Sequence, residues 1–533
     1  MDGYPWWQSG VVYHVYPRSF RDSDGDGVGD LTGIGQRIGH LADLGVDAVW
    51  ISPFYPSPMA DFGYDITDHT DVDPAFGTLD DFDALVRRAH RRGVRVLVDF
   101  VPNHTSEHHP WFRESRRGRD DPRRDWYLWA DPGADGGPPN NWRSVFGGPA
   151  WTLDEASGQY YYHAYLPEQP DLNWRNPKVR EAQYDVMRFW LARGVDGFRV
   201  DACRQLVKDD QLRDNPANPD FHDGLPPYDA LLPTYTTDRP ETLAMVTGMR
   251  EVLDEYRPDG VLLGEMYLPV ERLAHYYGER GGALHLPSNM HLISVPYRAA
   301  DVADLVVRYE AALPGHAWPN WVLGNHDRSR VATRVGSAQA RVAAMLLLTL
   351  RGTPIVYYGD EIGMTDVPVP DELVRDPYAR RVPGIGVGRD PERSPMQWSA
   401  APHGGFCAPE ATPWLPVPDS ATRVNVAAQA VDPTSMFCLY QDLIALRRAE
   451  PALSVGRVCD VRASGDLLSY RREYEGRAVT VALNLGRRPV SLPVDGRPGH
   501  VIAATHTGRA GERVDGALDL GPDEGVVVGE STT

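Results

Sequence analysis

Lysine and cysteine are scarce in this chain of 533 residues. Lys178 and Lys208 are its only lysines, and no Gly-Lys dipeptide occurs, which excludes the phosphate-binding P-loop. The four cysteines show no paired spacing, so the sequence predicts neither a disulfide framework nor a zinc site. Long apolar runs are also missing. The longest candidate, 342–350, is bounded by Arg341 and Arg351 and is too short to span a membrane.

The chain also lacks a basic segment followed by an apolar one at its start, MDGYPWWQSG. We therefore expect no secretory signal and a cytoplasmic protein. Basic charge is in deficit as well, because 54 Lys and Arg stand against 74 Asp and Glu, a formal net charge of −20. Such a surface repels phosphate backbones and anionic lipids, so we expect neither nucleic acid nor a membrane as partner.

The composition, 42% hydrophobic and 24% charged, is that of a globular protein. Short β-branched runs alternate with amphipathic helical segments, such as a helix after Thr78 with Asp81 completing a capping box and one after Asn176. Repeated strand–helix units predict a parallel sheet, and about eight of them predict a (β/α)8 TIM barrel. Seven runs are predicted to be buried strands: 11–16, 48–51, 94–101, 197–200, 261–263, 322–323 and 354–357.

Two stretches interrupt this alternation. Residues 104–174 are rich in Trp, Tyr, Pro, Gly and Asn, which predicts a loop-rich inserted domain, here domain B, after the third strand. Residues 360–432 predict a second loop-rich insertion, after the eighth strand. Short strand-like pieces in 454–533 predict a C-terminal antiparallel β domain of sandwich-like type. The barrel is then expected in 1–103 and 175–453.

Polar residues follow several predicted strands directly, at what would be the carboxyl-terminal mouth of the barrel. Barrel enzymes place their chemistry at this end. One such residue is usually a solvated strand end, but convergence from separate strands predicts a catalytic site. The residues are Asp99, Asn103, His104, Arg199, Asp201, Glu265, His326 and Asp327.

Four of these segments resemble the signature segments of the α-amylase superfamily of glycoside hydrolases: DFVPNH (99–104), GFRVDACRQ (197–205), GEMYLP (264–269) and VLGNHD (322–327). QPDLNW (169–174) resembles the additional segment of the same superfamily. The resemblance spans roughly residues 10–450. Other segments are similar to its α-glucosidase and oligo-1,6-glucosidase branch: VVYHVYPRSFRDSDGDGVGDLTGI (11–34), GYDITDH (63–69) and RDPERSPMQW (389–398).

The resemblance implies that Asp201 is a nucleophile and Glu265 a general acid and base. A retaining glycosidase needs such a pair about 5 Å apart. Arg199 precedes Asp201 by two residues, so both point to one face of a strand, and we expect its charge to keep Asp201 ionised. Glu265 must hold a proton for the leaving oxygen. Asp327 is implied to bind sugar hydroxyls as the ring distorts.

Cleavage at a chain end needs a closed pocket. The resemblance implies that Asp65 and an arginine hold the non-reducing hydroxyls of a terminal glucose. Arg393 is our prediction for the arginine, and Arg389 is the alternative. Tyr64, next to Asp65, is implied to offer a stacking face.

Four residues complete the implied sugar site. His104 and His326 would donate hydrogen bonds to the same ring. Phe146 and Tyr165 lie in domain B and resemble residues that wall the sugar site, although packing within the domain is an equal alternative.

An acidic loop follows the first predicted strand and reproduces the start of a calcium loop, with alternating oxygen ligands and a glycine for the turn. Its closing glutamate is missing, because Gly33 stands there. The resemblance implies a structural Ca²⁺ or Mg²⁺, with a hydrated acidic turn as the alternative and no cofactor for catalysis. The implied ligands are Asp22, Asp24, Asp26, Val28 and Asp30.

We therefore expect a retaining, exo-acting α-glucosidase for short α-glucosides, with transfer to a second sugar as a further activity. Ala202 favours α-1,4 linkages by resemblance, with α-1,6 left open, and Cys203 departs from the branch pattern. A trehalose synthase-type isomerase is the alternative, although such enzymes show Asp-Ala-Val-Pro where this chain has 201–204, Asp-Ala-Cys-Arg. A non-catalytic barrel subunit is a remote alternative. The expected partner is a small oligosaccharide, and either a monomer or a homodimer fits.

Overall fold

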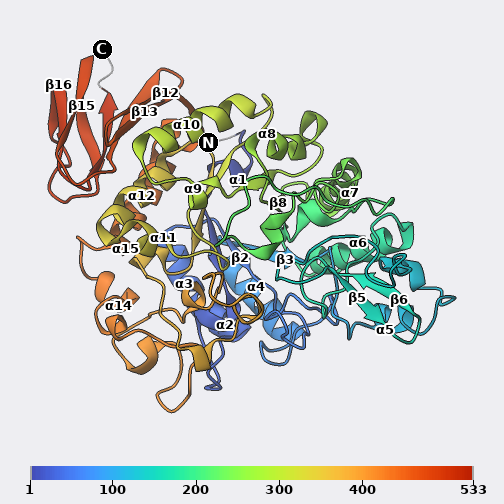
Figure 1. Cartoon of the computed structure of the whole chain (residues 1–533). Coiled ribbons are helices and arrows are strands. Elements are labelled where there is room, and N and C mark those ends of the chain that lie inside the picture. Colours follow the sequence, from blue (N-terminus) through green and yellow to red (C-terminus); the bar gives the residue numbers. More distant parts are fainter. Residues whose placement is uncertain (1–2, 531–533) are drawn as a thin grey trace.

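Eight parallel strands surround the centre of the molecule (Figure 1). The computed structural model describes residues 3–530. In order around the sheet the strands are β10 (Asn320–Val322), β11 (Thr353–Tyr357), β1 (Val12–Val15), β2 (Ala48–Ile51), β3 (Arg95–Phe100), β7 (Gly197–Val200), β8 (Val261–Met266) and β9 (Leu286–Asn289).

The side chain of Asn320 spans the seam between the two end strands, β9 and β10. Its Oδ1 accepts a hydrogen bond from the Asn289 amide at 2.9 Å, and its Nδ2 donates to the Pro287 carbonyl at 2.6 Å. The predicted barrel is confirmed. β9 was not among the predicted strands, because Leu-Pro-Ser-Asn has no β-branched residue and contains a proline.

Helices cover the outside of the barrel and begin where the sequence signals them. The Thr78 hydroxyl accepts from the Asp81 amide and the Asp81 carboxylate accepts from the Thr78 amide, so the predicted capping box is confirmed. Asn176 caps the next predicted helix. The long helices are α3 (Leu31–Leu44), α4 (Leu79–Arg91), α6 (Pro177–Ala192), α7 (Pro240–Tyr256), α10 (Ala299–Ala312), α12 (Ser337–Thr349) and α15 (Met436–Ala449).

The segment predicted as domain B lies to one side of the barrel (right in Figure 1). It contains a small antiparallel sheet in the order β4 (Trp129–Ala130), β6 (Gln159–Tyr162) and β5 (Trp151–Asp154), together with the short helix α5 (Pro110–Ser115). Lys208, which follows β7, joins this segment to the barrel: its ammonium donates to Asn103 Oδ1 at 2.8 Å and pairs with the carboxylate of Asp171.

The C-terminal strands form one antiparallel sheet, not the two sheets expected of a sandwich-like domain. One face of the sheet packs on α10 and α12 of the barrel, and a second apolar cluster, which includes Leu467, Val501 and Val526, is buried among the C-terminal strands themselves. The buried guanidinium of Arg472 also donates to the carbonyls of Thr349 and Gly456. The sheet lies at the upper left in Figure 1, in the order β12 (Arg457–Ser464), β13 (Leu467–Tyr474), β14 (Arg477–Asn484), β17 (Gly525–Glu530), β15 (Val490–Ala504) and β16 (Arg513–Leu520).

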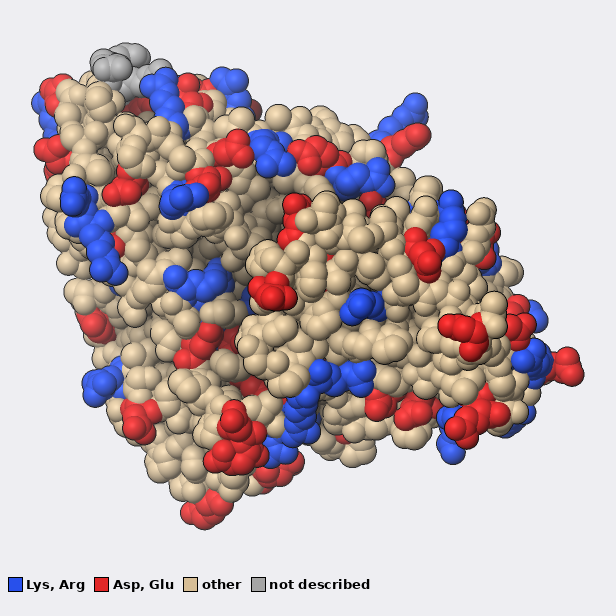
Figure 2. All heavy atoms as spheres, viewed as in Figure 1, with Lys and Arg blue, Asp and Glu red and all other residues tan. Residues whose placement is uncertain are grey.

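Short elements connect β11 to α15. They include the helices α13 (Pro377–Arg381) and α14 (Val426–Gln429), within the predicted loop-rich insertion. Among residues 3–530, no helix combines the length and apolar character needed to cross a membrane. On the face drawn in Figure 2, acidic and basic side chains are interspersed rather than gathered by sign.

Candidate active site

One guanidinium, that of Arg199 on β7, lies at the centre of the predicted site. It is 1% exposed, and its Nη1 donates to Asp99 Oδ1 at 2.8 Å and to Asp201 Oδ1 at 2.6 Å. Its Nη2 lies 3.0 Å from Glu265 Oε1. These residues come from the adjacent parallel strands β3, β7 and β8 or follow them directly. Neighbouring nitrogens of one planar group therefore place the predicted catalytic pair side by side.

A strained backbone position fixes the second oxygen of Glu265. Ala202 has a φ of 44°, in the left-handed region that residues with a Cβ rarely adopt. The turn directs its amide to Glu265 Oε2, at 2.9 Å. Both oxygens of Glu265 are thus held by groups that flank Asp201 in the sequence, the Arg199 side chain and the Ala202 amide. Strain of this kind persists where the surrounding structure overdetermines it, and it clusters at functional sites.

The pKa of Asp201 is set by opposing contributions, of which the charge of Arg199 is one. Burial raises the pKa of Asp201 well above its ordinary value; Arg199 acts against this rise, but the negative charges of Glu265 and Asp99 add to it. Burial likewise raises the pKa of Asp99 to about 6, against the same arginine. Arg199 thus favours the ionised form of Asp201, and burial and the two neighbouring carboxylates oppose it. Three carboxylates around one cation favour the binding of one proton.

Asp327, after β10, lies in a contrasting environment. Its Oδ1 is 3.1 Å from Arg393 Nη2 and 3.3 Å from Arg389 Nη1. Burial acts to raise the pKa of Asp327, but His326 and the two arginines outweigh it and hold the pKa well below its ordinary value. Burial also lowers the pKa of His326 to about 3, so this ring is neutral at pH 7, where its Nε2 shares a 2.9 Å hydrogen bond with the Tyr64 hydroxyl.

The structure places Asp65 differently from the prediction. Asp65 is 0% exposed, and burial raises its pKa to about 6. Its carboxylate accepts hydrogen bonds from its own loop and does not reach an arginine; the donors are the Ser57 hydroxyl and the amides of Ala60 and Asp61. Asp65 thus shapes the loop that carries Asp61.

Asp61 is the carboxylate of this loop that meets an arginine. Its Oδ1 lies 2.7 Å from Arg389 Nη2. Arg393, our first choice, donates to the His326 carbonyl at 2.7 Å and to Asp327, so it supports the backbone after β10. The sequence missed Asp61 because DFGYD offers two aspartates four residues apart, and only the loop conformation decides which one faces Arg389.

Aromatic rings of domain B reach the same site. The ring of Phe146 lies 4.8 Å from the guanidinium carbon of Arg389 and stacks on Tyr378 at 5.0 Å. Tyr165 packs edge-on against His104 at 5.4 Å and donates from its hydroxyl to Gln205 Oε1 at 2.5 Å. The predicted wall residues therefore lie beside the predicted polar residues.

His104, which packs against Tyr165, also contacts Tyr64. Nε2 of His104 lies 3.1 Å from the Tyr64 carbonyl and 3.2 Å from Gln169 Nε2. Burial lowers the pKa of His104 to about 4, so the ring is neutral at pH 7.

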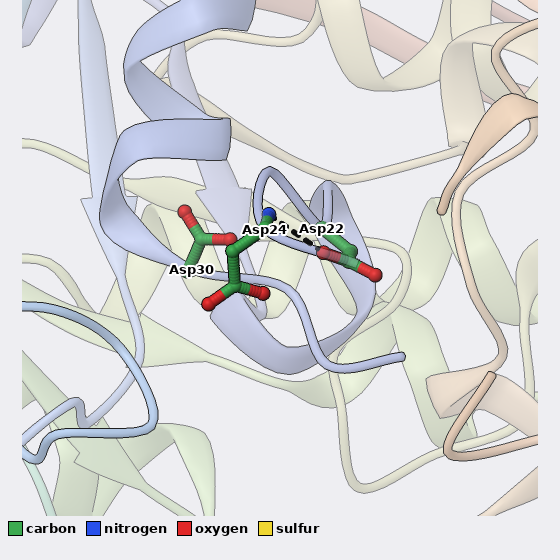
Figure 3. Close-up of side chains that lie close together, drawn as sticks. All are labelled: Asp22, Asp24 and Asp30. Atoms are coloured by element: carbon green, nitrogen blue, oxygen red, sulfur yellow. Dashed lines mark hydrogen bonds between the residues drawn. The ribbon is translucent and has the colours of Figure 1, made fainter. Parts of the chain in front are cut away.

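The acidic loop between β1 and α3 gathers three of its carboxylates (Figure 3). Ligand oxygens of Asp22, Asp24 and Asp30 lie within 4.8 Å of one another, and the Asp24 amide donates to Asp22 Oδ1 at 3.0 Å. Asp26 lies outside this trio and accepts a hydrogen bond from the Val28 amide at 2.7 Å. The loop therefore brings three of its four predicted carboxylates together.

Most of the chain matches one known protein family. Residues 14–456 match the family described as alpha amylase, catalytic domain. The chain belongs to the alpha-amylase family of glycoside hydrolases. Residues 456–527 match a domain of unknown function, DUF3459, which coincides with the C-terminal sheet.

The matches to individual similar proteins extend over nearly the whole of this chain. A probable alpha-glucosidase of Rhizobium meliloti (strain 1021) is 42% identical over 498 residues, which cover 90% of this chain and 89% of that protein. An oligo-1,6-glucosidase of Parageobacillus thermoglucosidasius is 38% identical over 542 residues, 94% of this chain and 93% of that protein. The crystal structure of an alpha-glucosyl transfer enzyme has a TM-score of 0.93 and 41% identity, and it covers 99% of this chain and 100% of that one.

Proposed function

We propose that this protein is a retaining, exo-acting α-glucosidase that cleaves short α-glucosides through a covalent glucosyl-enzyme. The observation that carries the proposal is the arrangement of Asp201 and Glu265 on neighbouring nitrogens of Arg199. A short spacing between two carboxyl groups is what retention requires, since the nucleophile must attack the carbon whose leaving oxygen the acid protonates. The names of the similar alpha-glucosidases agree with this chemistry.

In the first step, an Asp201 oxygen attacks the anomeric carbon while Glu265 transfers its proton to the departing glycosidic oxygen. In the second step Glu265, now ionised, takes a proton from water. The water oxygen bonds to the anomeric carbon, the bond from that carbon to Asp201 breaks, and α-glucose leaves. A sugar hydroxyl in place of water gives transglucosylation, and the likeness to an alpha-glucosyl transfer enzyme supports this second outcome. The Ala202 amide keeps Glu265 in place during both steps.

We assign the recognition of the terminal glucose to Asp61 and Arg389, in place of Asp65 and Arg393. Charged, planar groups that bond each other at 2.7 Å offer acceptors and donors for adjacent hydroxyls. Phe146 lies over Arg389 and closes the pocket from the side of domain B. A pocket closed at the non-reducing end admits chain ends only, which makes the action exo.

The acidic loop is proposed to hold a structural Ca²⁺ or Mg²⁺, remote from catalysis. Carboxylate oxygens are the ligands that these hard cations prefer, and Asp22, Asp24 and Asp30 present them within reach of one another. A bound cation would neutralise the mutual repulsion of the three carboxylates and so stabilise the entry into α3.

The test of the catalytic assignment is replacement of Asp201. D201A is expected to lower turnover of p-nitrophenyl α-glucoside by at least about a thousandfold, because the covalent step loses its nucleophile. Proton NMR of the glucose first released from p-nitrophenyl α-glucoside should show the α-anomer, because this substrate has no second sugar with a free anomeric carbon. Initial β-glucose would refute retention, and unchanged turnover by D201A would refute the nucleophile. Trehalose as the main product from maltose would favour the isomerase alternative.

A further inference from the structure

A buried carboxylate outside the sugar pocket, that of Asp376, holds the arginine proposed to bind the sugar. Asp376 is 0% exposed. Its Oδ1 accepts from Arg389 Nε at 3.0 Å and from Nη2 at 2.7 Å, and its Oδ2 accepts from the Arg389 amide at 2.8 Å. Side chain and backbone of the arginine are therefore fixed by one carboxylate.

This contact decides which donors of Arg389 remain free. A guanidinium carries five N–H groups in one plane. Asp376 takes Nε–H and one Nη2–H, Asp61 takes the other Nη2–H, and Nη1 donates towards Asp327. One Nη1–H is left on the edge next to Asp327. Without Asp376 the guanidinium of Arg389 could rotate about its side-chain bonds, and the remaining Nη1–H would no longer point in one fixed direction.

Asp376 is at the same time the N-cap of α13, since its side chain accepts from the Tyr378 amide. The other end of α13 is tied to domain B, where Arg381 donates to the carbonyls of Phe146 at 3.1 Å and Gly147 at 3.0 Å. Gly147 has a φ of 86°, and a Cβ there would meet Val382 at 2.7 Å. The chain thus approaches α13 as closely as a glycine permits.

We propose that Asp376 is a positioning residue that orients Arg389 towards the terminal sugar, and that α13 is a strap linking this arginine to domain B through Arg381. The inference rests on the proposed role of Arg389 in sugar binding. Asp376 and α13 then set how tightly the pocket holds the non-reducing end, although neither touches the substrate.

The experiment is a cycle of D376N, R389A and the double variant. Asparagine also caps helices well, so D376N removes the charge and keeps the cap. We expect D376N to raise KM for maltose at least tenfold with a smaller fall in kcat. In the R389A background it should change KM less than twofold, because no guanidinium remains to be oriented. The exposed Asp371, in the same segment, gives the matched control D371N, with wild-type kinetics.

An equal effect of D376N on KM in both backgrounds would overturn the inference, as would an unchanged KM in wild type. If D376N does not fold, D376E retains the charge but displaces the carboxylate by one methylene. D376E is then expected to raise KM at a wild-type melting temperature, and an unchanged KM would again overturn the inference.

The strap has its own variant, R381Q, at an exposed position. It breaks the paired bonds to domain B and leaves Asp376 and Arg389 intact. A rise in KM of threefold or more supports the strap, and wild-type KM refutes it. The Kd of glucose, measured by calorimetry for every variant, reports how well Arg389 is oriented for binding, independently of catalytic turnover. Failure of the proposed function would show as an inactive wild type, whereas failure of this inference would show as an active wild type with insensitive variants.

Discussion

Replacement of Lys208 tests how the barrel and domain B are joined. The side chain is 2% exposed, and its ammonium bonds Asn103 at 2.8 Å and the carboxylate of Asp171. K208M keeps a long apolar stem of similar shape and removes the charge together with the hydrogen bond to Asn103. Asp171 would retain two donors, the Asn103 side-chain amide and the Ala164 amide, each at 2.8 Å.

Removing one partner of a buried ion pair costs about 3–5 kcal/mol. Since Asp171 keeps two hydrogen bonds, we expect the lower end, a loss of about 3 kcal/mol in the free energy of unfolding. Lys178 is the chain's other lysine and is exposed, so K178M is a matched control. Its effect should lie within about 0.5 kcal/mol.

Urea unfolding followed by tryptophan fluorescence and circular dichroism measures both variants. Equal unfolding midpoints for K208M and K178M would refute the reasoning. A double variant, K208M with D171N, sharpens the test, because a neutral amide at Asp171 no longer needs a counter-charge. It should recover part of the lost stability, and a further loss would show that the pair matters through shape and not through charge.

Three other predictions concern pH, linkage and metal. Burial raises the pKa of Asp360 to about 7, so its protonated form contributes stability below about pH 4 that is lost as the pH rises through 7. D360N should remove this dependence, which is on the order of 3 kcal/mol between pH 5 and pH 8, in denaturant titrations at these two pH values; parallel curves for both proteins would contradict it. A202V should raise the rate on isomaltose relative to maltose and lower the melting temperature, because a β-branched residue is strained at this positive φ; an unchanged rate ratio would argue against a linkage role. EDTA should lower the melting temperature of wild type but not of D22N/D24N, and an equal shift in both would exclude this loop as the metal site.

The barrel was predictable because its signals are local and repeated. A capping box such as that of Thr78 and Asp81 needs only neighbours in sequence, and strands such as β2 and β3 are short, largely buried and mostly apolar segments that contain β-branched residues. β9 escaped prediction for the opposite reason. Its place in the sheet comes from neighbours on both sides and from Asn320 at the seam, and Leu-Pro-Ser-Asn carries no trace of either.

The site was predictable in its chemistry and less so in its geometry. The residue types after β3, β7, β8 and β10 indicated a catalytic site, and the structure brings Arg199, Asp201 and Glu265 together. The choice between Asp61 and Asp65 depends on a loop whose conformation Asp65 itself fixes from inside. Asp376 could not be found at all, because its partner Arg389 lies thirteen residues away across a segment without periodic pattern.

The site contains two clusters of carboxylates, each around an arginine, and the clusters differ in their number of cations. Arg199 faces Asp99, Asp201 and Glu265, whereas Arg389 faces Asp61, Asp327 and Asp376 with Arg393 as a second cation. His326 and both arginines lower the pKa of Asp327, whereas Arg199 alone acts against burial and two neighbouring carboxylates at Asp201, whose pKa is raised.

Three carboxylates that share one cation in the Arg199 cluster favour the binding of one proton there, while Asp327 stays ionised. The surplus of carboxylates over cations, with neutral substrates, directs a negative field at the anomeric centre. That field favours the positive charge of an oxocarbenium-like transition state over the uncharged ground state, which is the difference that catalysis requires.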